Sequence, residues 1–117
     1  MLGRQDSKIK EILSHGRKSH RWQRPAGAFA QLNDDVLFGE VWAREEELST
    51  RDRCIVTVTA LMASGVLDSS LQFHILNAKN HGVTAQEMAE ILTHAAFYAG
   101  WPKAWAAFRM AKEVYEG

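Results

Sequence analysis

The sequence is poor in cysteine, in proline and in long apolar stretches. Its single cysteine, Cys54, cannot form a disulfide within one chain, so a disulfide-stabilised fold is excluded and a cytoplasmic location is expected. Two prolines in 117 residues, with no repeat or low-complexity tract, indicate a single domain over residues 1–117. No apolar run approaches the roughly 18 residues of a membrane span, and the N-terminus lacks an apolar signal segment, so no membrane partner is expected.

Charge of either sign is not in excess. The 14 Lys and Arg residues balance the 14 Asp and Glu residues, which argues against a nucleic-acid partner because such binding needs a basic surface. The signs are separated along the chain, since residues 1–24 are basic and residues 34–47 are acidic. These segments could face each other within or between subunits, or could be two solvated surfaces.

Motifs of several enzyme classes are also absent. There is no P-loop, dinucleotide-binding fingerprint or metalloprotease motif, and we expect no cofactor. The lack of Cys-x-x-Cys excludes a dithiol redox cycle within one chain. Glu40, His74 and His94 have no diagnostic ligand spacing, so no metal site is expected.

What the sequence does contain is a series of helix signals. Ser49 can act as an N-cap, Thr84-Ala85-Gln86-Glu87 is a capping box, and Gly100 stops a helix before Pro102. About six helices are expected, over residues 6–15, 25–43, 49–64, 68–80, 84–99 and 103–116, with a basic loop over 16–24. The alternating residues 56–59 would also fit a strand, but the length of the segment and its cap favour a helix. The fold class is therefore all-α.

Two titratable residues lie on expected apolar faces. His74 shares helical spacing with Leu71, Ile75 and Ala78, so it is either a hydrogen-bonded core histidine or a catalyst. Glu40 continues the apolar stripe of its helix, and an inward carboxylate there would need a cation or a proton. That stripe consists of Phe29, Leu32, Val36 and Leu37.

The fifth expected helix adds His94 and Tyr98, which are i, i+4 neighbours. Its short connection to the fourth helix predicts an antiparallel hairpin, so His74 and His94 could line one pocket without touching. Cys54 lies in the first turn of the third helix, where it could be either reactive or a small buried residue. With Arg51 and Arg53 nearby, these groups would suit proton transfer on a small anionic molecule.

Several segments together resemble a known family. These are residues 38–42 (Phe-Gly-Glu-Val-Trp), 48–53 (Leu-Ser-Thr-Arg-Asp-Arg), His74 with 81–84 (His-Gly-Val-Thr), and 97–102 (Phe-Tyr-Ala-Gly-Trp-Pro). In order and spacing, the chain from about residue 38 to 115 resembles carboxymuconolactone decarboxylases, a branch of the alkylhydroperoxidase D-like fold. The resemblance implies an all-α homo-oligomer, a trimer or a hexamer, that removes CO₂ from a small carboxylated lactone without a cofactor.

The resemblance also suggests roles for individual residues. The proposed general acid is His74, assisted by Glu40, and Arg53 would hold a substrate carboxylate. His94 would shape the pocket and is a further catalytic candidate. The remaining candidates for substrate contact are Arg51, Tyr98, Trp42 and Trp101.

Two other functions stay open at this stage. Peroxidases of the same fold carry Cys-x-x-Cys before a histidine; aligned on His74, those cysteines would fall at Leu67 and Ser70, where no thiol exists. A peroxidase would therefore have to use Cys54 with an external thiol. The other alternative is a non-catalytic oligomer that binds a small ligand.

Overall fold

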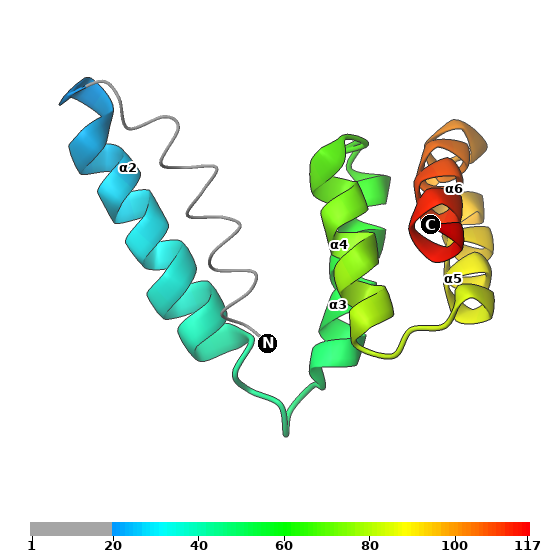
Figure 1. The fold of residues 1–117 in the computed structure, drawn as a ribbon, viewed down its shortest axis with the longest axis horizontal. Coiled ribbons are helices and arrows are strands. Elements are labelled where there is room, and N and C mark those ends of the chain that lie inside the picture. Colours follow the sequence, from blue (N-terminus) through cyan, green and yellow to red (C-terminus); the bar gives the residue numbers. More distant parts are fainter. Residues whose placement is uncertain (1–19) are drawn as a thin grey trace. The chain divides into compact units, whose positions relative to one another are not determined.

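The computed structural model describes residues 20–117, with the side chains of residues 26–117, and this part of the chain contains helices and no strand (Figure 1). The all-α prediction is confirmed, whereas the helix expected over residues 6–15 lies outside the described residues. Contacts divide the chain into two compact units, residues 1–47 and 48–117, which we describe separately. A single domain over residues 1–117 stays a prediction. None of the described helices combines the length and apolarity needed to cross a bilayer.

The first unit contains one continuous helical segment. It begins as α2 (His20–Leu32) and continues directly as η1 (Asn33–Val41), a π-helix of wider turns. The helix expected over residues 25–43 is therefore present, but it starts earlier. The basic loop predicted over residues 16–24 is wrong for residues 20–24, which are helical.

The buried face of this segment differs from the predicted stripe. Phe38 and Trp42 are buried, with their rings stacked at 5.7 Å between centroids. The residues predicted to face inward are exposed instead: Phe29, Leu32, Val36 and Leu37. The π-turns explain part of the difference, because the backbone N–H of Trp42 donates to the carbonyl of Leu37, five residues earlier. Wider turns rotate the later side chains away from the 3.6-residue period on which the prediction relied.

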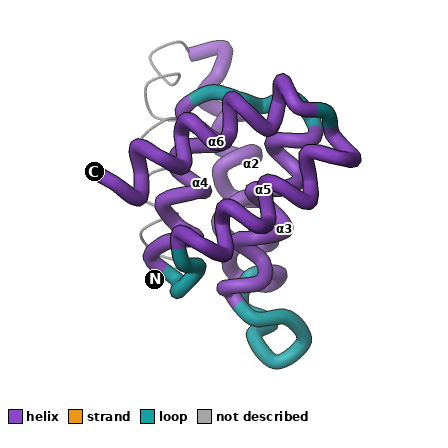
Figure 2. Tube along the Cα trace, turned by 90° about the vertical axis from the view of Figure 1, so that its right-hand side faces the viewer, coloured by secondary structure: helices purple, strands orange, loops and turns teal. Residues whose placement is uncertain are grey.

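The second unit is a four-helix arrangement of α3 (Thr50–Ala63), α4 (Ser69–Asn80), α5 (Ala85–Ala99) and α6 (Trp101–Glu116). α3 packs against α4 and α5, and α6 packs against the same two helices, so the four form a closed ring around one core (Figures 1 and 2). The core side chains of this unit are Cys54, Val58, Met62, Leu71, Ile75, Ala78, Val83, Met88, Leu92, Ala95, Ala96, Ala104, Ala107 and Ala111.

Local signals set the ends of these helices, as predicted. The hydroxyl of Ser49 accepts the backbone N–H of Asp52 at 3.0 Å, and the carboxylate of Asp68 accepts that of Ser70 at 2.9 Å. The expected capping box at the start of α5 is formed in both directions between Thr84 and Glu87. These bonds satisfy backbone donors that a helix leaves free in its first turn.

Gly100 joins α5 to α6 without any intervening loop. Its φ of 102° and ψ of 144° lie in a region that residues with a side chain rarely adopt. α6 starts at Trp101, two residues before the predicted start, with Pro102 in its first turn. The sharp turn places α5 and α6 side by side. It thereby determines which side chains of the two helices are buried and which lie on their outer faces.

Replacement of Gly100 by alanine should therefore destabilise the protein. An added Cβ meets only ordinary contacts at Gly100, so the cost comes from the backbone conformation and should be about 1–3 kcal/mol. Urea denaturation followed by circular dichroism measures this loss. Gly27→Ala is the control, because Gly27 is helical with open space around its Cβ position, and this change should not destabilise. Equal stability of Gly100→Ala and the natural chain would contradict the prediction.

Candidate active site

His74 lies on α4, and its imidazole is largely buried within the chain. Its Nδ1 atom is inaccessible and has no hydrogen-bond partner among the described residues. The ring meets that of Phe73 edge-on at 5.2 Å. Burial lowers the pKa of His74 below its ordinary value, so the imidazole is neutral near neutral pH. A buried ring nitrogen without a partner is costly in a core residue, so this atom calls for an explanation.

A polar seam continues along the same face of α4 and consists of His74, Asn77 and His81, at positions i, i+3 and i+7. The Asn77 side-chain amide donates to the Cys54 sulfur on α3 at 3.4 Å. His81 Nδ1 lies 2.7 Å from the backbone carbonyl of Asn77. Because a carbonyl only accepts, Nδ1 carries the proton, and the buried Nε2 of His81 is left without a partner in the described chain.

Cys54 is fully buried beside this seam, with its sulfur 3.9 Å from Nδ1 of His81. Burial raises the pKa of the thiol, and the hydrogen bond from Asn77 opposes that shift with a smaller effect. The thiol is therefore protonated near neutral pH, and the structure favours the small buried residue over the reactive one. Sequence reasoning missed Asn77 and His81; the signal that could have found them is the polar repeat on an otherwise apolar face.

His94 and Tyr98 line an open groove of about 610 Å³ between α3 and α5. Their rings lie 5.2 Å apart, as the i, i+4 spacing predicted. Glu90 and Thr59 supply the other polar side chains, and the remaining lining residues are Ile55, Ala63, Ile91, Ala95 and Ala99. His74 is not among the residues that line this groove. The described part of the chain therefore presents the two histidines at separate places rather than in this one pocket.

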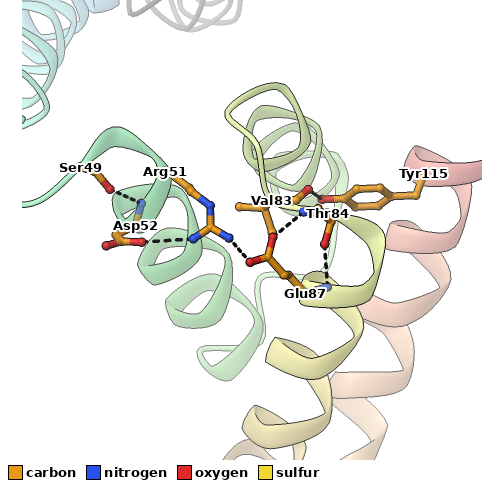
Figure 3. Close-up of polar contacts among 7 residues, drawn as sticks. All are labelled: Ser49, Arg51, Asp52, Val83, Thr84, Glu87 and Tyr115. Carbon is orange, nitrogen blue, oxygen red and sulfur yellow. Dashed lines mark hydrogen bonds and ion pairs between the residues drawn. The ribbon is translucent and has the colours of Figure 1, made fainter.

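Arg51 is held by carboxylates. Its guanidinium forms an ion pair with Glu87 on α5 and a weaker one with Asp52 at 3.5 Å (Figure 3). Glu87 also accepts the backbone N–H of Thr84 at 3.0 Å, so one carboxylate caps α5 and connects it to α3. The backbone bond from Thr84 and then the bond from Arg51 lower the pKa of Glu87. Arg51, expected to contact substrate, thus has a structural partner.

The other candidates lie on different elements. Arg53 donates through Nε to the carbonyl of Leu48 at 3.2 Å. Trp101 is half-exposed at the start of α6, whereas Trp42 is almost wholly buried in the first unit, which leaves it little surface for a substrate. Glu40 is exposed in the chain, so the prediction that it faces inward there is wrong. Its pairing with His74 stays a prediction, because the two units are described separately.

No group of three or more His, Cys, Asp or Glu residues in the described chain is arranged to hold a metal ion. The polar groups present can instead hold and move protons. His74 offers a buried ring nitrogen on α4, and His94 with Tyr98 offers a second polar pair on α5. His74 is largely buried, and electrostatic interactions are stronger there than in water, whereas His94 and Tyr98 are exposed in the chain.

Comparison with known families and proteins identifies the family of this chain. The model of the carboxymuconolactone decarboxylase family matches residues 27–113, a stretch that contains every candidate residue named above. A curated relative, 4-carboxymuconolactone decarboxylase of Acinetobacter baylyi (strain ATCC 33305 / BD413 / ADP1), is 40% identical over 88 residues. The similarity covers 75% of this chain and 64% of the relative, so the chain spans just under two thirds of that relative's length.

The Arg51–Glu87 connection should make stability depend on acid. Because the folded pKa of Glu87 lies below its unfolded value of about 4.3, the carboxylate stabilises the fold above that pH, and this contribution disappears as the pH falls through the lowered folded pKa. Glu87→Gln should therefore be less stable than the natural chain at neutral pH, with the difference shrinking below about pH 4.3. Urea denaturation at several pH values measures it. Glu90→Gln on the same helix is the control, and an equal loss there would refute the assignment.

The Cys54 thiol should be unreactive in the folded protein. Burial keeps it protonated and inaccessible, so reaction with a chromogenic disulfide reagent should be slow in buffer and immediate in denaturant. The absorbance of the released reagent gives both rates. Rapid, complete labelling of the folded chain would contradict this prediction and would restore the thiol-based alternative.

Proposed function

Because this chain belongs to the carboxymuconolactone decarboxylase family, we propose that it is a lyase that removes CO₂ from a small carboxylated lactone. The name of the curated relative supports 4-carboxymuconolactone as the substrate. The product is then the enol-lactone of 3-oxoadipate, an intermediate in the breakdown of aromatic acids. No cofactor is needed for this reaction, because the lactone itself accepts the electrons.

The observation that carries this proposal is the buried, unpartnered ring nitrogen of His74. When the C–C bond to the carboxylate breaks, CO₂ leaves and the electron pair is delocalised into the lactone carbonyl. A proton must then be delivered to carbon, and an imidazolium held in an apolar site is suited to deliver it. The imidazole is then neutral, as it is in the free enzyme, and it takes up a proton from solvent when the next anionic substrate binds.

The lowered pKa of His74 determines under which conditions its imidazole carries the proton that it must donate. In the free enzyme, burial keeps the imidazole neutral near pH 7. A bound carboxylate substrate places negative charge nearby and favours the protonated form. The proton therefore enters together with the anionic substrate. Apolar surroundings also destabilise the leaving carboxylate relative to neutral CO₂, which favours its loss.

The other roles follow from position. Arg53 is the proposed anchor for a substrate carboxylate, because a guanidinium can hold a carboxylate through two hydrogen bonds. His94 and Tyr98 shape the groove that receives an apolar ring. Glu40 would orient His74 or share its proton, whether it comes from the same chain or from an adjacent subunit.

Replacement of His74 by asparagine should lower kcat for 4-carboxymuconolactone by about 10²–10⁴-fold, the usual contribution of a general acid. In the natural enzyme, kcat/KM should fall as the pH rises through the lowered pKa of His74, so this limb lies below about pH 6.5. Stopped-flow absorbance measures both. The matched control is Cys54→Ala, which removes the only thiol and should retain decarboxylation.

Two outcomes would oppose the proposal. If His74→Asn loses several kcal/mol of stability but keeps its activity per folded molecule, His74 is a core histidine rather than an acid. If the natural chain turns over no lactone or β-keto acid and yet binds them, it is a ligand-binding relative of the enzymes. Peroxidase turnover abolished by Cys54→Ala would identify the thiol alternative.

A further inference from the structure

The groove between α3 and α5 has a charged side chain toward each of its ends. The two helices start side by side at the Arg51–Glu87 ion pair. They also end side by side, since their last residues, Ala63 and Ala99, both line the groove. Glu90 lies toward the helix starts and is the one carboxylate among the lining residues. The negative charge of the groove is therefore at the end formed by the helix starts.

The other end of the groove lies next to the ammonium group of Lys103. This residue is in the first turn of α6, and its Nζ donates to the carbonyl oxygen of Ala63 at 3.1 Å. Its Cε lies 3.9 Å from the position that a Cβ would take at Gly65, so the side chain crosses the turn that ends α3. The hydrogen bond and this contact hold the ammonium group beside a residue that lines the groove.

The bond to Ala63 uses only part of the hydrogen-bonding capacity of Lys103. An ammonium nitrogen carries three N–H donors, and this carbonyl accepts one of them. No carboxylate among the described residues forms an ion pair with Lys103. A lysine at a helix C-terminus accounts for the bond to Ala63 but not for the remaining donors. Because Lys103 is only partly buried, an anion at this end of the groove can accept from them.

The proposed substrate carries two carboxylates with different fates. One leaves as CO₂, and the other remains on the product. An ion pair with the first would stabilise the substrate more than the transition state, and would oppose the loss of CO₂. Pairing of the second is the same before and after the C–C bond breaks. A cation beside the groove is therefore suited to the carboxylate that remains.

We infer that Lys103 binds the carboxylate that the substrate retains, with the lactone ring between the apolar walls of the groove. The inference rests on the proposed function, which supplies the substrate. Glu90, toward the opposite end, repels a carboxylate, so the two charges favour one orientation of the ligand. Arg53 is the competing anchor. Lys103 donates to a residue that lines the groove, whereas Arg53 Nε donates to Leu48, which does not line it.

Binding of muconolactone tests this inference without turnover, because muconolactone is the same lactone without the carboxylate that leaves. Lys103→Met should weaken its binding by about 10-fold or more, the range for a hydrogen bond to a charged group. Binding of the neutral methyl ester should not change, and Lys103→Arg should retain most of the affinity for the acid. Isothermal titration calorimetry measures these affinities. The matched control is Lys112→Met, which removes the same charge from an exposed position of α6 outside this groove and should bind as the natural chain does.

Several results would overturn the inference. Equal affinity of the natural chain for the acid and its ester is one, and binding of neither compound is another. Equal losses of acid and ester binding in Lys103→Met would show that Lys103 only holds the end of α3. Loss of acid binding in Arg53→Met, with none in Lys103→Met, would assign the carboxylate to Arg53. If Lys103→Met is not folded by circular dichroism, Lys103→Gln replaces it, because a glutamine can still donate to Ala63.

Failure of the proposed function gives a different result. A natural chain that does not decarboxylate 4-carboxymuconolactone, but binds muconolactone through Lys103, loses the decarboxylase assignment and keeps the carboxylate site. A chain that decarboxylates this lactone with the same KM before and after Lys103→Met loses the inference alone.

Discussion

Close packing of α6 through alanine is the constraint on which the second unit depends. Ala104, Ala107 and Ala111 let the helix backbone approach α4 and α5 closely, and Gly100 makes the sharp turn that brings it there. A larger residue at Ala107, which is fully buried, would have to push the helices apart. The same choice leaves the bulky side chains of Trp105 and Phe108 exposed on the outer face of α6.

The contacts between α3 and α4 explain why Cys54, the only cysteine of the chain, is not proposed as the reacting group. Cys54 is enclosed, receives a hydrogen bond from Asn77 and lies beside a histidine whose Nδ1 proton is directed to a backbone carbonyl. That histidine nitrogen cannot act as a base toward the thiol while it carries a proton. The geometry resembles a Cys–His pair in composition, but burial raises the pKa of the Cys54 thiol by more than the hydrogen bond from Asn77 lowers it, so the thiol stays protonated.

Much of the fold could be predicted because its signals are local. Ser49, Asp68 and the Thr84–Glu87 box act within four residues of themselves, and each caps the expected helix. The π-turns after Asn33 were not predicted, since a 3.6-residue period was assumed there. Among the site residues, the His94–Tyr98 pair is also local and was predicted correctly. Arg51 could not be assigned from sequence, because its partner Glu87 is 36 positions away on another helix.

The unsatisfied nitrogen of His74 is a cost that the described fold retains. An apolar residue of similar size would pack the same position of α4 without leaving a buried polar atom unpaired. A proton-transfer group, in contrast, must keep one atom free for the molecule on which it acts, and must be desolvated enough for its pKa to respond to that molecule. In the described chain, Nδ1 of His74 is unpaired but inaccessible, and burial lowers the pKa of the imidazole. The same is not true of Arg51, whose guanidinium is already neutralised by Glu87. Of the polar groups singled out from the sequence, His74 is therefore the one on which the proposed proton transfer is most directly tested.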